Sequence, residues 1–229
     1  MLLFHWSYLI LLPGFVLMIW SQHQIQRTYR TYAEVKSSVD LTGADVAHIL
    51  LHNLGLQSIR VEMVLGELSD HYDPVTKAVR LSRSTYSSSS LSATAIAAHE
   101  CGHALQDQQH YRFLRWRSSL LPAVNIGSQI GPLLILAGIL FSAAGSVASG
   151  LVYVGMALFA TALGFHLVTL PVEFDASRRA LHLIEQLQLT AHEREATARV
   201  LRAAAWTYVA TAVYTALQLA QLLVISRER

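Results

Sequence analysis

The chain has 229 residues, of which 53% are hydrophobic and only 14% are charged, and its mean hydropathy is +0.38. This composition is typical of a membrane protein and argues against a soluble or disordered chain. The formal net charge of +2 gives no indication of nucleic-acid binding. The one cysteine, Cys101, excludes an internal disulfide framework and agrees with a reducing compartment.

Four apolar segments are long enough to cross the roughly 30 Å hydrocarbon core of a bilayer as helices. They cover residues 2–20, 120–144, 147–170 and 203–225. The tryptophans fall at the predicted membrane edges, where the indole ring is favoured: Trp6, Trp20, Trp116 and Trp206. The first segment lacks a positively charged start, so we expect a retained anchor rather than a cleaved signal peptide.

Lysine and arginine residues near the ends of these segments predict the orientation. Most of them lie in residues 21–119 and 171–202, whereas the opposite side has Arg227, Arg229 and the terminal amine. Because positive residues are retained in the cytoplasm, residues 21–119 and 171–202 are expected there, with both chain ends outside.

Residues 21–119, between the first two spans, carry the signals of a small α+β segment. The predicted elements are a helix over 42–54, a strand over 60–64 and a hairpin of strands over 68–73 and 78–82. Gly55 is expected to end the first helix, and Pro74 to lie in the hairpin connection. The strand over 79–83 is interpreted either as an edge that pairs with a substrate backbone or as an ordinary hairpin strand. A further helix is predicted from about Leu91.

After the third span, Pro171 occupies a position typical of the first residue of a helix, which predicts a new helix over 172–189. Thr190 and Glu193 form a capping-box pattern that predicts a further helix running unbroken into the fourth span. The expected parts are a membrane anchor, a catalytic segment, a span pair, a return segment and a last span, at 1–20, 21–119, 120–170, 171–202 and 203–225.

The most informative pattern is H-E-x-x-H at residues 99–103. On a helix, His99 and His103 point the same way and can bind one zinc ion, while Glu100 reaches a water in an open coordination position. The metal lowers the pKa of that water, and the glutamate takes its proton. Glycine destabilises a helix, so Gly102 needs an explanation, and we expect that a metal or substrate faces this position and requires a small residue.

A catalytic zinc ion usually has three protein ligands, so a third must come from elsewhere. The metzincin pattern fails, because Gln106 and Gln109 stand where it needs Gly and His. A glutamate on another helix is the main remaining option. Glu173 is the best candidate, because an even number of spans separates it from His99 and places both on one side of the membrane.

Three separated segments together resemble the YugP-type neutral zinc metallopeptidases of bacterial membranes. They are Gly66-Glu67-Leu68-Ser69-Asp70-His71-Tyr72-Asp73-Pro74, His99-Glu100-Cys101-Gly102-His103-Ala104-Leu105-Gln106 and Leu170-Pro171-Val172-Glu173-Phe174-Asp175-Ala176-Ser177. The resemblance covers most of the chain and implies a gluzincin-like zinc peptidase with Glu173 as third ligand. In the wider clan, an aspartate four residues after the glutamate orients a ligand histidine, whereas this chain has Ser177 there.

Three further residues are candidates for support of the site. Asp175 or Asp107 could orient a ligand imidazole through its second nitrogen, and Asp175 could equally be a charge favoured by a helix start. His166, an ionisable residue near the end of the third span, is either a transition-state hydrogen-bond donor or an interfacial histidine.

These observations predict a mostly α membrane protein with about four transmembrane helices and a small zincin-like α+β catalytic head in the cytoplasm. The expected activity is zinc-dependent peptide-bond hydrolysis at the inner or plasma membrane of a bacterium, as a hydrolase of the metalloprotease class. The substrate is expected to be a polypeptide, such as a membrane-protein tail, an unfolded protein or a peptide, with no nucleic-acid partner. The alternatives are a zinc-binding scaffold or adaptor without catalysis, and a site-2-type intramembrane protease.

Overall fold

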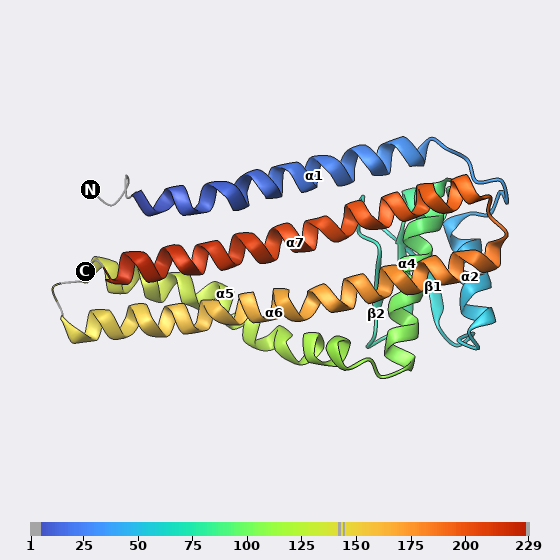
Figure 1. Cartoon of the computed structure of the whole chain (residues 1–229). Helices are drawn as coiled ribbons and strands as arrows, with labels where there is room; N and C mark the ends of the chain where they lie inside the picture. Colours follow the sequence, from blue (N-terminus) through green and yellow to red (C-terminus); the bar gives the residue numbers. More distant parts are fainter. Residues whose placement is uncertain (1–5, 142, 144, 228–229) are drawn as a thin grey trace. The chain divides into compact units, whose positions relative to one another are not determined.

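The computed structural model describes residues 6–141, 143 and 145–227. The predicted starts of the first span at residues 2–5, positions 142 and 144 of the second span, and Arg229 lie outside these residues. A short 3-10 turn over Trp6–Leu11 leads into α1, and the elements follow in the order drawn in Figure 1. They are α1 (Leu12–Ala33), α2 (Gly43–Asn53), β1 (Arg60–Val64), β2 (His71–Asp73), β3 (Ala78–Ser82), α3 (Arg83–Tyr86), α4 (Leu91–Gln108), α5 (Arg112–Leu140), α6 (Ser146–Ile184) and α7 (Ala191–Arg227).

The chain divides into two compact units, which are described separately. The first unit contains residues 1–20, 115–170 and 208–229, and the second contains residues 21–114 and 171–207.

The first unit is built from four helices that are long and apolar enough to cross a membrane, as predicted. These helices cover Trp6–Ala33, Arg112–Leu140, Ser146–Leu187 and Ala191–Arg227, and they continue beyond the unit. Glycines let α5 and α6 approach closely here. A Cβ added at Gly131 would lie 2.9 Å from the carbonyl oxygen of Gly155, and one at Gly138 would lie 2.6 Å from that of Ala148. Small residues at such crossings are the usual means of helix packing in lipid.

The second unit contains a three-stranded sheet in the order β1-β3-β2. β1 pairs in parallel with β3, and β2 pairs antiparallel with β3, so the predicted hairpin is confirmed. The interpretation of β3 as an edge strand is wrong, because β3 is the central strand and pairs with β1 on one side and with β2 on the other. The strand predicted from residue 68 begins only at His71, since Leu68 has a φ of +53° in a turn that the Ser69 hydroxyl stabilises.

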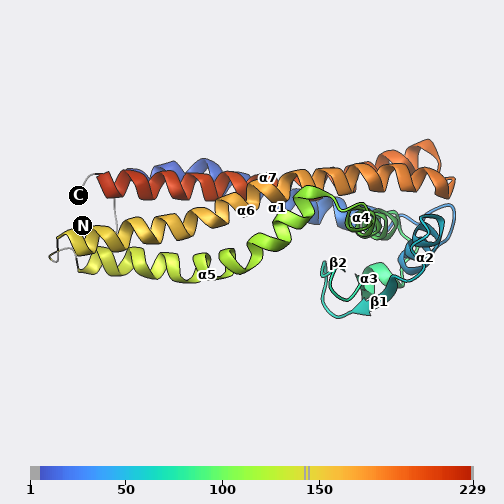
Figure 2. The ribbon, with the colours of Figure 1, turned by 90° about the horizontal axis from the view of Figure 1, so that it is seen from below.

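The helices of the second unit pack around α4. Figure 2 shows α4 nearly end-on, with the sheet on one side and the second-unit ends of α6 and α7 on the other. Buried apolar side chains from all of these elements form one core, among them Leu50, Leu51, Val79, Leu81, Ala97, Ala98, Ile184 and Val200. Their burial is the main stabilising contribution that holds α4 in place.

Helix starts follow the sequence signals. Thr42 and Asp45 form a reciprocal capping box at the start of α2, and Gly55 follows the helix with a φ of +71°. Thr190 and Glu193 form the predicted capping box at the start of α7, with a distance of 2.8 Å from the Thr190 amide to the carboxylate. α7 then runs unbroken to Arg227, as expected.

The predicted helix start at Pro171 is wrong. α6 is continuous from Ser146 to Ile184 and contains Pro171 in its interior, so the third span and the segment that carries Glu173 are one helix. Proline costs a helix one backbone hydrogen bond, but helices in membrane proteins tolerate it where neighbouring groups satisfy the exposed carbonyls. The Tyr111 hydroxyl donates a hydrogen bond to the carbonyl oxygen of Pro171 itself at 3.4 Å.

Candidate metal centre

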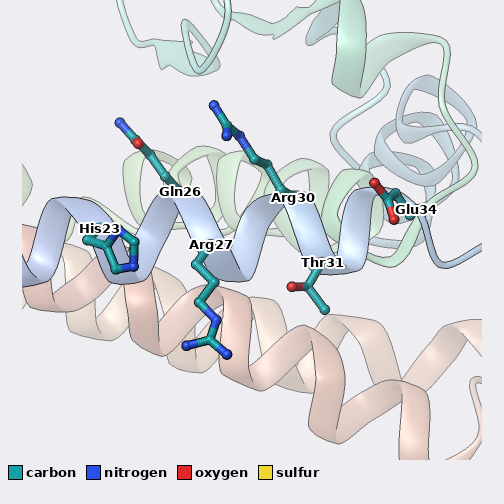
Figure 3. A pocket seen from close by; sticks show the side chains of 6 residues that line it. All are labelled: His23, Gln26, Arg27, Arg30, Thr31 and Glu34. Carbon is teal, nitrogen blue, oxygen red and sulfur yellow. The ribbon is translucent and has the colours of Figure 1, made fainter.

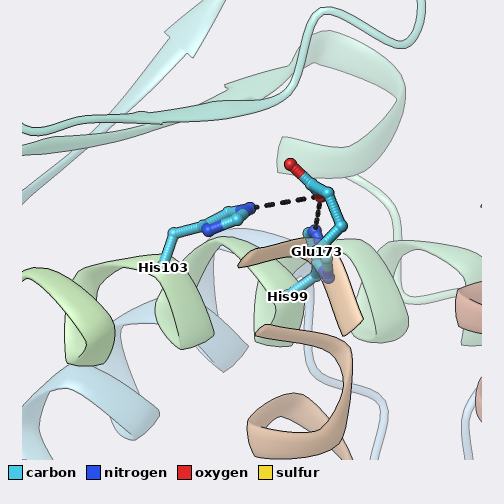
Figure 4. A group of neighbouring side chains, drawn as sticks. All are labelled: His99, His103 and Glu173. Carbon is cyan, nitrogen blue, oxygen red and sulfur yellow. Dashed lines mark hydrogen bonds and ion pairs between the residues drawn. The ribbon is translucent and has the colours of Figure 1, made fainter. Parts of the chain in front are cut away.

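Three predicted ligands from two helices meet in the second unit. His99 and His103 lie one turn apart on α4, and Glu173 lies on α6 (Figure 4). The Glu173 Oε2 atom is 3.2 Å from His99 Nε2 and 3.6 Å from His103 Nε2. The three side chains are almost entirely enclosed, with exposed fractions of 14%, 10% and 3%.

These separations fit a zinc ion. Ligand atoms about 2.0–2.2 Å from a tetrahedral zinc lie roughly 3.3–3.6 Å from one another. The two distances to Glu173 match this spacing, and one ligand atom from each of the three residues lies within 4.8 Å of the others. Two imidazoles and one carboxylate form a typical catalytic set that leaves the fourth position open.

A close crossing of α4 and α6 brings the ligands together. The Ser90 side chain caps α4, and a Cβ added at Gly102 would lie 2.6 Å from the carbonyl oxygen of Ala176. The expected reason for a small residue at Gly102, a metal or substrate facing it, is therefore wrong. Gly102 lets the α6 backbone pass close enough for Glu173 to reach both histidines.

The second ring nitrogen of each histidine contacts a neutral polar side chain. His103 Nδ1 lies 3.0 Å from Gln106 Oε1, and His99 Nδ1 lies 3.3 Å from the Ser177 hydroxyl. Ser177 therefore occupies the place that the resemblance assigns to an aspartate. Sequence reasoning missed Gln106, although its position three residues after His103 places it on the same helix face.

The two predicted supporting aspartates have different partners. Asp175 accepts a hydrogen bond from Gln106 Nε2 at 2.9 Å and is paired with Arg178 and Arg179, so it reaches His103 through Gln106. Asp107 accepts hydrogen bonds from the Tyr72 hydroxyl at 2.7 Å and from Lys77 at 2.5 Å, which fastens β2 and the turn before β3 to α4.

Glu100 is buried beside the ligands, with only 6% of its surface exposed. Its pKa is raised to about 7, chiefly by burial and also by the carboxylates of Glu173 and Asp70, while His99 and a backbone hydrogen bond from Tyr72 act to lower it. A carboxyl group with a pKa near neutrality can take up and release a proton at physiological pH.

Glu173 is held as an anion. Burial alone would raise its pKa, but hydrogen bonds and charge interactions with His103 and His99 outweigh burial and place the pKa well below its usual range. At neutral pH the group is therefore a carboxylate, which is the form that binds a cation.

His166 lies on the first-unit part of α6, and its proposed role as a transition-state donor stays a prediction.

A pocket of about 340 Å³ lies in the second unit along one face of α1 (Figure 3). It is lined by His23, Gln26, Arg27, Arg30, Thr31 and Glu34, a polar set that includes none of the predicted ligands.

Comparisons with known proteins agree with the donor set. The family described as "Putative neutral zinc metallopeptidase" matches residues 7–227. A relative in Bacillus subtilis (strain 168), named "Putative membrane protease YugP", is 41% identical over 210 residues, which cover 91% of each chain. No solved structure matches the chain. The match along nearly the whole length shows that the chain belongs to this neutral zinc metallopeptidase family.

Proposed function

We propose that this protein is a membrane-embedded zinc endopeptidase that hydrolyses peptide bonds at the cytoplasmic membrane face. The observation that carries the proposal is the meeting of His99, His103 and Glu173 beside the buried carboxyl group of Glu100. The excess of Lys and Arg in residues 21–119 and 171–202 supports a zincin-like head in the cytoplasm of a bacterial cell.

His99, His103 and Glu173 would hold the zinc ion, and Gln106 and Ser177 would orient the two imidazoles. Zinc bound there supplies a positive charge that lowers the pKa of a water molecule and polarises a substrate carbonyl. Glu100 accepts a proton from the attacking water and passes it to the leaving amine. Burial of the site excludes bulk water and strengthens these interactions.

The substrates proposed are polypeptides: membrane-protein tails, unfolded proteins or peptides. A zinc-binding scaffold without catalysis is less well supported, because a structural site normally closes its fourth position and has no use for a buried carboxyl group beside it. A site-2-type intramembrane protease is also disfavoured, because Arg112, Arg115 and Arg117 follow the motif helix so closely.

Cleavage of casein by detergent-purified protein tests the proposal. Wild type is expected to cut casein in a chelator-sensitive manner, and Glu100→Gln is expected to be about 10²–10⁴-fold slower because the general base is lost. Metal analysis should show equal zinc in both proteins, since Glu100 is not a ligand.

Glu67→Gln, which changes an exposed loop glutamate, is the matched control and should cut at the wild-type rate. Turnover retained in Glu100→Gln would refute the assignment of the base. Absence of cleavage by zinc-loaded wild type on casein and on a set of membrane-protein tails would favour the scaffold.

A further inference from the structure

We propose that Gln106 is the positioning residue of the metal centre, and that it fixes the tautomer of His103 while tying α4 to the α6 segment that carries Glu173. This inference rests on the proposed zinc-binding function. Gln106 has none of its surface exposed, so the hydrogen bonds of its side chain must be made within the protein.

The amide of Gln106 can be oriented in only one way. Its nitrogen lies 2.8 Å from the carbonyl oxygen of Val172 and 2.9 Å from Asp175 Oδ2, which are both acceptors. Turning the amide over would bring its oxygen against these two oxygens and lose both hydrogen bonds. The amide oxygen must therefore face His103.

This orientation determines which nitrogen of His103 carries the proton. Gln106 Oε1 can only accept, so the neutral imidazole must donate from Nδ1 across the 3.0 Å contact. When the ring is neutral, Nε2 is then the nitrogen with the free lone pair, on the side of the ring that faces Glu173. Gln106 thus selects Nε2 as the atom through which His103 would bind zinc.

Asp175 fixes the amide from the other side. Its carboxylate is paired with Arg178 and Arg179, and Arg179 also donates to the side chain of Gln109, the residue that follows α4, at 2.6 Å. The arginines hold Asp175 as an acceptor, and Asp175 in turn holds the Gln106 nitrogen. The carboxylate therefore acts on the histidine through a neutral amide rather than by direct contact.

Gln106 also connects the two ligand-bearing helices. Val172 immediately precedes Glu173, so the hydrogen bond to its carbonyl fixes the backbone beside the third ligand relative to α4. The side chain of Gln106 thus fixes both the orientation of the His103 ring and the position of Glu173, which a residue that only fills space would not do.

Zinc affinity of the detergent-purified protein, measured by competition with a chelating dye, tests this role. Gln106→Ala is expected to weaken zinc binding about 10–100-fold, in the range that loss of a ligand's outer hydrogen bond produces. Gln108→Ala, at an exposed glutamine of the same helix turn, should leave the affinity unchanged. Equal affinities of Gln106→Ala and Gln108→Ala would overturn the proposal.

A pair of variants that exchanges donor and acceptor groups between positions 106 and 175 distinguishes a lost hydrogen bond from misfolding. Gln106→Glu keeps an acceptor for His103 but loses both donors and faces Asp175 with a second carboxylate, so zinc binding should weaken. Adding Asp175→Asn restores a donor at position 175 and should recover most of the lost affinity. A double variant no better than Gln106→Glu would count against the relay.

The tautomer of His103 provides a measurement independent of both zinc and catalysis. In metal-free protein labelled with ¹⁵N-histidine at pH 8, nuclear magnetic resonance should show His103 protonated at Nδ1 in wild type and a mixture of tautomers in Gln106→Ala. An unchanged tautomer would refute the proposal even if the protein proved to be a scaffold. Failure of wild type to bind zinc would instead refute the proposed function.

Discussion

At the scale of single residues, burial of Glu100, the proposed general base, lowers the stability of the fold at neutral and alkaline pH. Burial raises its pKa from 4.5 to about 7, so the folded protein favours the neutral carboxyl group. A raised pKa of this kind contributes stability that is fully present below about pH 4.5 and is lost as the pH rises through 7. Above pH 7, the metal-free protein must keep an ionised carboxylate in a buried position.

Glu100→Gln is therefore expected to stabilise the metal-free protein at alkaline pH. The shift corresponds to an order of magnitude of about 3 kcal/mol at pH 8, because each pKa unit is about 1.4 kcal/mol. Urea unfolding in chelator should show this gain at pH 8 and nearly equal stabilities at pH 4. Added zinc should reduce the difference, since its charge favours the ionised form. A variant less stable than wild type at pH 8 would contradict the buried, neutral Glu100.

At the scale of elements, the crossing of α4 and α6 controls the site through Gly102. In Gly102→Ala the new Cβ would lie 2.6 Å from the backbone oxygen of Ala176, so one helix must move. We expect at least a tenfold loss of zinc affinity and a destabilisation of about 1–3 kcal/mol, typical of overpacking, despite the better helix propensity of alanine.

Dye competition and thermal unfolding measure the two effects of Gly102→Ala. The control is Gly164→Ala in α6, the helix that α4 crosses at Gly102; an added Cβ there meets no atom within 4 Å, and zinc affinity should not change. If Gly102→Ala binds zinc as wild type does, the close approach does not determine the position of Glu173.

The elements predicted correctly are those whose signals are local. The Thr42–Asp45 and Thr190–Glu193 pairs specify helix starts within four residues of sequence, and the apolar runs specify the four long helices. The errors concern tertiary context. The parallel pairing of β1 with β3 joins residues that are 18 positions apart, so no local pattern predicts it. Whether Pro171 ends a helix or lies inside one depends on the groups packed around it.

The same division applies to the candidate site. Spacing on one helix brought out His99, Glu100 and His103, and membrane topology added Glu173. Gln106 escaped notice because its importance lies in contacts with α6, 66 and 69 residues further along the chain. Hydrogen bonds between residues so far apart in the chain leave no periodic pattern in the sequence.

At the scale of the whole molecule, long helices link the two units. α6 and α7 each contribute to the membrane-type first unit and to the second unit that contains the ligand cluster. The second unit is therefore expected to lie at a membrane surface, and the distribution of Lys and Arg predicts which surface. The proposed cytoplasmic site depends on that orientation, which can be tested without any assay of activity.

Cysteine labelling can determine the membrane orientation of the chain, because the thiol of the native Cys101 is unreactive. Cys101 is fully buried, and burial raises the pKa of its thiol well above the usual range, so little reactive thiolate is present. Ser146→Cys, at the exposed start of α6, should react with a membrane-impermeant maleimide in intact cells, whereas Glu67→Cys, in the exposed loop before β2, should react only after permeabilisation. The reverse pattern would place the ligand cluster outside the cell. The substrates would then have to be extracellular polypeptides, and the reducing environment inferred from the single cysteine would no longer apply.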